Sequence, residues 1–137
     1  MYEVTKNDQL RFVVLFHEYE SGHERADHWD LMLEHEGQLL TWALSEIPKP
    51  GRSIVATTLA DHRIEYLELE GAISHDRGSV SRLLGGRYWW KTDTVKHVAI
   101  LEMQNVSWEV EFTPFDGDSV MVTVAELSSQ PPEAVDH

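Results

Sequence analysis

The sequence predicts an all-β protein that folds as a single domain. Apolar and polar residues alternate with period two in many short stretches, which is the pattern of half-buried β-strands. Turn-forming residues, chiefly Gly, Pro, Asn and Asp, separate these stretches at short intervals. About nine short strands at this spacing are typical of a β-sandwich or a closed β-barrel, and a barrel leaves no sheet edge exposed.

The expected strands follow one another along most of the chain. They are Arg11–Phe16, His28–Glu34, Gln38–Leu44, Ser53–Leu59, Tyr66–Glu70, Arg87–Lys91, His97–Gln104, Ser107–Thr113 and Ser119–Leu127. A tight hairpin is expected at Glu36-Gly37, a loop at Pro48–Gly51 and a turn at Asp116–Asp118. The segment Ser79–Leu84 is the one short stretch with a helical pattern.

The clearest alternation lies in the stretch HWDLMLE. The residues expected to face inward are Trp29, Leu31 and Leu33; those expected to face outward are His28, Asp30, Met32 and Glu34. A strand that shows His and Asp side by side on its outer face presents two good metal ligands together.

The composition limits the kinds of function that remain. At 137 residues the chain predicts one domain over residues 1–127, followed by a polar, Pro-containing tail over residues 128–137 that we expect to be disordered. It has no Cys, so a metal site would use His and carboxylate ligands. We see no signal peptide and no membrane-spanning run, and we expect a cytoplasmic protein with no membrane partner. The net charge of −13 argues against non-specific coating of nucleic acid, but it leaves room for a local site that handles one strand end.

Three histidine-containing segments could carry chemistry. His28 and Asp30 share a strand face, and His17 follows an expected strand closely enough to fold back beside His28. His23, in the intervening loop, competes with His17 as a ligand. Taken alone, each of these histidines is more simply explained as a surface or loop residue with no role. The third segment contains His62 and Tyr66, which could together contact a phosphate, with the histidine donating a proton or a hydrogen bond.

Several common catalytic motifs are absent from the sequence. There is no Gly-rich phosphate loop, no GxSxG or HExxH motif and no Cys nucleophile. The usual forms of covalent catalysis are therefore disfavoured, whereas a metal-assisted hydrolysis would need only the residues already named.

Taken in order, these segments resemble the 3′-phosphoesterase domain of bacterial DNA ligase D. The family pattern of RFV, two hydrophobic residues, any residue and His matches RFVVLFH at 11–17. The family's HYDFRLE matches HWDLMLE at 28–34, and its following SWAV matches TWAL at 41–44. The family's EDHPxxYxxFEGxI matches ADHRIEYLELEGAI at 60–73 without a gap. The resemblance runs from about Arg11 to Trp90.

The resemblance implies an eight-stranded β-barrel with an apolar interior and an active site on its outer face. It also implies a manganese-dependent enzyme that removes a 3′-phosphate or a terminal ribonucleotide from DNA ends during repair, in company with ligase or polymerase partners. By position, the metal ligands would be His17, His28 and Asp30. The residues that hold the scissile phosphate would be His62 and Tyr66.

The chain departs from the family pattern at several substrate-binding positions. The family has a phosphate-binding Arg at the position of Met32, and a thioether cannot replace a bidentate guanidinium. Arg25, in the longer loop after His17, and Arg63, next to His62, are candidates to replace it. Ala60 stands where the family has Glu. These departures also motivate an alternative function, a catalytically degenerate barrel that binds a metal, a phosphorylated ligand or a protein without cleaving it.

Overall fold

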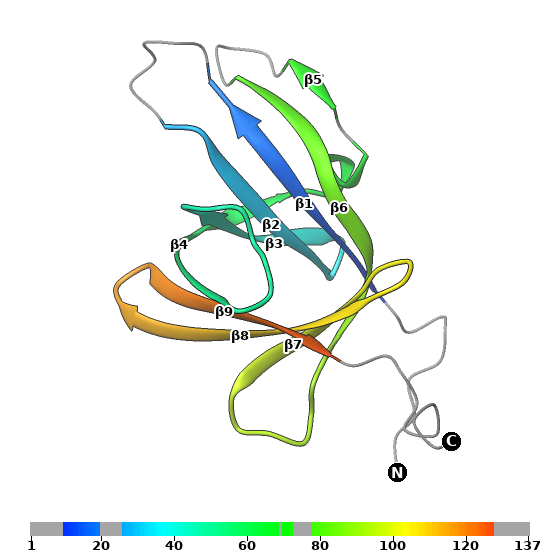
Figure 1. Ribbon diagram of the computed structural model, residues 1–137. Coiled ribbons are helices and arrows are strands. Elements are labelled where there is room, and N and C mark those ends of the chain that lie inside the picture. Colours follow the sequence, from blue (N-terminus) through cyan, green and yellow to red (C-terminus); the bar gives the residue numbers. More distant parts are fainter. Residues whose placement is uncertain (1–9, 20–25, 69, 73–77, 128–137) are drawn as a thin grey trace.

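The computed structural model describes residues 10–19, 26–68, 70–72 and 78–127 of the chain (Figure 1). These ranges contain nine strands and a single turn of 3-10 helix, η2. The strands are β1 (Leu10–Glu18), β2 (His28–His35), β3 (Gln38–Leu44), β4 (Arg52–Arg63), β5 (Gly71–Ala72), β6 (Ser79–Trp90), β7 (His97–Glu102), β8 (Ser107–Asp116) and β9 (Ser119–Leu127). The helical turn η2 spans Ile64–Leu67.

The strands form one antiparallel sheet that closes on itself. Their order is β1-β2-β3-β4-β9-β8-β7-β6, and β6 pairs back onto β1 to complete an eight-stranded barrel. The two-residue strand β5 lies outside this circuit, beside the start of β6 (Figure 1). Closure pairs the backbone groups that an open sheet would leave exposed at its edges. The all-β expectation is confirmed, and of the two architectures that the strand spacing allowed, the protein is the barrel.

The main apolar core fills the barrel interior. It takes inward-facing side chains from every strand of the barrel, among them Phe12, Leu33, Tyr88 and Phe112. The hydroxyl of Tyr88 donates a hydrogen bond of 2.6 Å to the carbonyl oxygen of Glu34, which satisfies its polar group in this apolar setting. Burial is the main cause that raises the pKa of Tyr88 to about 12, so the phenol stays neutral.

A second, smaller apolar cluster lies against the outside of the barrel wall. Val13 and Leu15 of β1 and Met32 of β2 pack there with Tyr66 and Leu67 of η2, joined by Leu39 and Val80. Because η2 covers this patch, consecutive residues of β1 and β2 are buried on both faces of the sheet. The expectation that the outer residues of HWDLMLE face solvent is therefore wrong for two of them. Asp30 is 2% exposed and Met32 is fully buried.

Three local expectations need correction. Ser79–Leu84 is not helical but forms the first half of β6, because pairing with β1 along nearly the whole strand outweighs a weak local preference. The strand expected at Tyr66–Glu70 is wrong at its start, because Tyr66 and Leu67 belong to η2. These two consecutive residues are both buried on one side, whereas successive residues of a strand point to opposite faces. The strand expected at Ser53–Leu59 is longer than predicted: β4 extends to Arg63, so His62 lies within the strand and not after it.

The turn between β2 and β3 is confirmed as a tight hairpin. Glu36 has a φ of 50° and Gly37 a φ of 80°, so both central residues are left-handed, as a type I′ turn requires. Gly117, with a φ of 57°, occupies the turn between β8 and β9. Within the described ranges, no helix combines the length and apolar character needed to cross a membrane.

Gly86 in β6 provides a test of the barrel's closure. A Cβ atom at this position would lie 2.1 Å from the backbone oxygen of Glu102 and 3.2 Å from the Phe12 ring. We expect Gly86→Ala to lower the free energy of unfolding by about 1–3 kcal/mol, because backbone atoms must move to admit the methyl group. Urea denaturation measures this change. Gly85→Ala is the matched control and should cost less, because its nearest contact is the flexible end of Arg82 at 3.3 Å. Equal effects of the two changes would contradict this account.

Candidate metal centre and phosphate site

The pairing of β1 with β2 places two histidines opposite each other. His17 near the end of β1 is the register partner of His28 at the start of β2. Asp30 is two residues further along β2, so it lies on the same face as His28 and diagonally across the strand pair from His17. One potential ligand atom from each of the three residues lies within 4.8 Å of the others. The structure thus brings together the three residues that the sequence proposed as metal ligands.

The carboxylate of Asp30 is the centre of this group. Its Oδ2 lies 3.2 Å from Nδ1 of His17, and its Oδ1 lies 3.0 Å from Nε2 of His28. The aspartate side chain is 3% exposed and the two histidine side chains are 13% and 19% exposed. Burial by itself raises the pKa of Asp30, but the contacts with His17 and His28 outweigh burial, and the pKa lies below its usual range. The carboxyl is therefore held as an anion.

The donor set fits a cation. Oδ1 of Asp30 is buried and accepts no hydrogen bond from the residues that the structure describes, although Nε2 of His28 lies 3.0 Å from it. Nδ1 of His28 lies 3.2 Å from the carbonyl oxygen of Ala26, which can only accept, so Nδ1 holds a proton. Nε2 therefore faces Oδ1 of Asp30, where a proton or a metal ion shared by the two atoms joins them, and the carbonyl contact orients the imidazole as metal sites require.

Two residues that the sequence analysis missed complete the surroundings of this group. Tyr19, which is 7% exposed, stacks on His17 with ring centroids 4.6 Å apart. The backbone N–H of Tyr19 donates a 2.8 Å hydrogen bond to Oδ1 of Asp27. This bond joins the residues on either side of segment 20–25 and so fixes the spacing of β1 and β2 beside the histidines. No periodicity or motif marks these two residues in the sequence, because their roles depend on the pairing of the two strands.

His62 and Tyr66 form a separate pair. Their ring centroids are 5.2 Å apart in an edge-to-face arrangement. Nδ1 of His62 lies 3.0 Å from the carbonyl oxygen of Ala60, which leaves Nε2 directed away from its own backbone. In the sheet, His62 is opposite Leu39, whereas Asp30 is opposite Ala43, four residues away along β3. Tyr66 packs in the same outer cluster as Met32, so η2 places this pair along the face that carries the metal-binding group.

A shallow recess adjoins the histidine group on the outer face of β2, β3 and β4. It has a volume of about 320 Å³, and its polar lining residues are Ser45, whose hydroxyl donates to the Val55 carbonyl, with Thr57 and Asp27. Its remaining wall is His28 with the small or apolar residues Ala26, Ala43, Leu44 and Val55. The recess has room for a small polar group next to His28.

A comparison with known protein families matches residues 20–120 to the DNA ligase D 3′-phosphoesterase domain. The chain belongs to this family. The match covers well over half of the chain and includes His28, Asp30, His62 and Tyr66, while His17 lies three residues before it. A search of curated proteins found no match. Membership of the family agrees with the closed barrel and indicates a phosphoesterase.

The structure places one of the two arginines that could replace the family's phosphate-binding Arg, and the other lies outside the described residues. Arg25 lies outside the described residues, as does His23. Arg63 is exposed at the end of β4, one residue beyond His62 and therefore on the alternate side of the strand. Neither assignment is tested by these positions, and both stay predictions.

Met32 is not an open position on the outer face of this phosphoesterase-family barrel. Its side chain is fully buried beneath η2, among apolar neighbours that include Val13 and Tyr66. An arginine in this place would carry its charge into an apolar contact unless η2 moved aside. The helical turn and the thioether are therefore consistent with each other, and the substitution is part of a packed cluster.

We expect Met32→Arg to destabilise the protein and not to restore a missing ligand. The free energy of unfolding should fall by roughly 3 kcal/mol or more, because a buried charge would have no partner. Met32→Leu, which keeps the volume and the apolar character, should cost less than about 1.5 kcal/mol. Urea denaturation of both variants measures the difference. An arginine variant as stable as the leucine variant would show that η2 readily leaves this face.

Proposed function

We propose that this protein is a divalent-metal-dependent phosphoesterase that acts on DNA 3′ ends, removing a 3′-phosphate or a 3′-terminal ribonucleotide during end repair. The observation that carries the proposal is the buried Asp30 carboxylate between two histidines, in a member of a phosphoesterase family; among the described residues, none donates a hydrogen bond to its Oδ1. The healed end would then be a substrate for a ligase or a polymerase, the class of enzyme that needs a 3′-hydroxyl.

His17, His28 and Asp30 would hold the metal. Two imidazole nitrogens and one carboxylate oxygen suit manganese and zinc, and the absence of Cys removes the ligand that most favours zinc. When bound, the cation supplies polarisation of a phosphoryl oxygen and lowers the pKa of a water. Asp30 contributes its negative charge at the centre of the site. The Ala26 carbonyl keeps the proton of His28 on Nδ1, so that Nε2 remains the ligand atom.

His62 and Tyr66 would bind the scissile phosphate. With Nδ1 held by the Ala60 carbonyl, Nε2 of His62 is the atom that can donate to a phosphate oxygen or protonate the leaving oxygen. The edge-to-face contact with Tyr66 limits the orientations of the imidazole ring. The phenol supplies a further hydrogen-bond donor on the same side. The recess beside His28 would then receive the sugar of the terminal nucleotide, where Ser45 and Thr57 offer hydroxyls.

The first prediction from this proposal concerns metal binding and turnover together. The wild-type protein should release phosphate, or a terminal ribonucleotide, from a primer–template when manganese is added, and EDTA should stop the reaction. His28→Ala should lose measurable manganese binding by calorimetry and lose at least about 100-fold in kcat/KM. His35→Ala, on the same strand but 46% exposed, is the matched control and should retain both properties.

The combination of results separates the two functions. Product that depends on manganese and disappears with His28→Ala supports the phosphoesterase. Manganese binding that needs His28, with no product from either substrate, would replace the enzyme with a catalytically degenerate binding module. No manganese binding at all would remove the metal-dependent mechanism.

The second prediction separates substrate chemistry from metal binding. His62→Ala should lower kcat by roughly 100-fold or more, because a proton donor to the leaving oxygen is lost, while manganese binding remains at the wild-type level. Single-turnover kinetics and calorimetry on the same sample provide the two measurements. A proportional loss of manganese binding would assign His62 to the metal site, and an unchanged kcat would remove it from the mechanism.

A further inference from the structure

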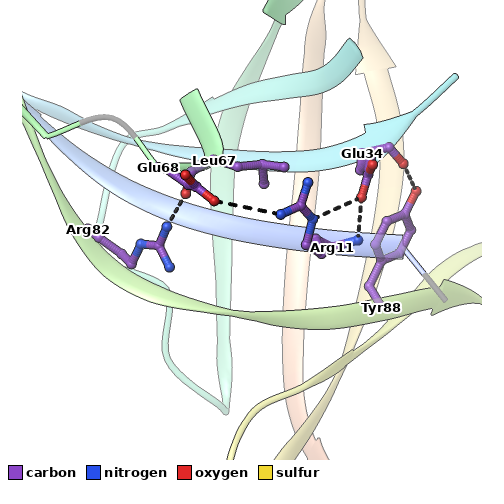
Figure 2. A network of polar contacts seen from close by, with 6 residues as sticks. All are labelled: Arg11, Glu34, Leu67, Glu68, Arg82 and Tyr88. Carbon is purple, nitrogen blue, oxygen red and sulfur yellow. Dashed lines mark hydrogen bonds and ion pairs between the residues drawn. The ribbon is translucent and has the colours of Figure 1, made fainter. Parts of the chain in front are cut away.

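Three arginines gather on the outer face of the barrel, at the other end of β1 from the candidate metal centre. Arg11, Arg82 and Arg87 line one pocket, with Phe12, Leu67, Glu68 and Gly86 as its remaining residues. Figure 2 shows Arg11 and Arg82 on this face, on either side of Glu68. Three of the chain's 11 Lys and Arg residues thus lie in one place on a protein with a net charge of −13.

We propose that this pocket is a distal phosphate-binding subsite, which holds the backbone of a DNA duplex whose 3′ end lies at the metal centre. The inference rests on the proposed function for its choice of ligand. A planar guanidinium matches the geometry of a phosphate and binds it through two parallel hydrogen bonds. A strongly acidic protein needs such a local concentration of positive charge to hold a polyanion.

The arrangement of Arg11 and Arg87 favours an anion between them. The two residues are direct cross-strand partners on β1 and β6, and both are exposed. Like charges directly opposite each other destabilise a sheet, and an anion bound between them offsets the repulsion by attracting both. Among the ion pairs within the described part of the chain, none involves Arg87, so its guanidinium is available to a ligand on this side.

Four carboxylates lie near the arginines and compete with a phosphate for them, but their contacts with the guanidinium groups are loose. Nε of Arg11 lies 3.5 Å from Oε1 of Glu34, and Nη1 of Arg11 lies 3.9 Å from Oε2 of Glu68. Both contacts are long for charge-assisted hydrogen bonds, although the backbone N–H of Arg11 holds the same Glu34 oxygen at 2.9 Å. The Glu68 side chain is 81% exposed, so it can turn into solvent when a phosphate arrives. Glu102 is the cross-strand neighbour of Arg87 on β7, and Glu70 accepts a 3.0 Å hydrogen bond from the backbone N–H of Arg82.

Arg82 is held in place before any ligand binds. Its Nη2 donates a hydrogen bond to the carbonyl oxygen of Leu67 at the end of η2 (Figure 2). Its Nη1 lies over Gly85, 3.3 Å from where a Cβ atom would be, so the missing side chain of this glycine makes room for the guanidinium. A positioned guanidinium loses less entropy on binding a phosphate than a free one would.

The spacing of the two sites matches a duplex. His17 and Arg11 are six residues apart on β1, which is roughly 20 Å at the rise of a β-strand. Each strand of a DNA duplex advances 3.4 Å per nucleotide along the axis, so this separation corresponds to about six base pairs. A duplex anchored at its 3′ end would reach the arginines only beyond that length.

The first test removes a cation from the pocket and measures binding to DNA. Arg87→Ala should weaken the binding of a 12-base-pair duplex by roughly threefold at low salt and reduce the slope of log K against log salt by about 1. Arg87→Lys should recover most of the loss. Lys91→Ala, which removes the same charge next to Glu109, is the control and should leave both values unchanged. Equal effects of Arg87→Ala and Lys91→Ala would show that DNA responds to the overall charge of the protein and not to this pocket, and would overturn the proposal.

A second variant should strengthen binding, a result that damage to the fold cannot produce. Glu68→Gln removes the competing carboxylate and keeps the shape of the side chain. It should tighten binding of the same duplex by roughly threefold at low salt. Unchanged binding by this variant, with unchanged binding by Arg87→Ala, would exclude the pocket as a DNA subsite and leave an acidic protein surface as its remaining partner.

Turnover on hairpins of two lengths keeps this proposal distinct from the proposed function. With a 3′-phosphorylated stem of 12 base pairs, Arg87→Ala should raise KM and leave kcat unchanged. With a stem of four base pairs, the variant and the wild type should have the same KM. A KM effect on both stems would contradict the distal position. If no substrate turns over, the phosphoesterase fails, whereas the salt slope and the Glu68→Gln result still decide whether the pocket binds DNA.

Discussion

The pairing of β1 with strands on both of its sides is the interaction on which the rest of the structure depends. β1 hydrogen-bonds to β2 on one side and to β6 on the other, and the second pairing closes the barrel. Closure fixes the position of His17 against His28 and that of Arg11 against Arg87. The two sites are therefore the two ends of one strand. Their separation cannot change without breaking the ladder on at least one side.

Asp30 shows that a metal-binding residue of this kind can lower the stability of the folded protein. A buried carboxylate costs free energy when one of its oxygens lacks a hydrogen-bond donor, as Oδ1 of Asp30 does within the described part of the chain. The neighbouring imidazoles outweigh the effect of burial on the carboxylate, and the pKa of Asp30 is lowered as a result. The apolar residues beneath η2, including Leu15 and Met32, hold the surrounding wall rigid. An unsatisfied ligand of this type is expected where the surrounding structure over-determines its position.

The turn η2 has consequences for both sites. It places Tyr66 beside His62, it buries Met32, and its last carbonyl group accepts the hydrogen bond from Arg82. Because η2 covers the wall between the metal-binding group and the arginine pocket, a ligand that contacts both must pass over it. The shape of the outer face therefore follows from one helical turn whose buried residues are consecutive in the sequence.

The sequence by itself determined the fold class, most of the strands and the residues that form the metal-binding group. Period-two alternation and turn residues depend only on local geometry, so strands such as Gln38–Leu44 and Ser119–Leu127 were predicted with their observed bounds. The residues themselves proposed His28 with Asp30, a ligand at His17 or His23, and the pair His62 and Tyr66. The motif resemblance then selected His17 and the eight-stranded barrel. Their metal-binding and catalytic roles remain proposals, because proximity alone does not assign them.

Only the tertiary structure decided what covers the outer face. Alternation distinguishes the two faces of a strand, but it does not show that a distant segment packs on the second face and buries Asp30 and Met32. Tyr19 and Asp27 acquire their roles from strand pairing, and the register of β1 with β6 sets Arg11 opposite Arg87. These contacts join residues far apart in the chain, and their geometry depends on how the barrel closes, which no local pattern in the sequence records.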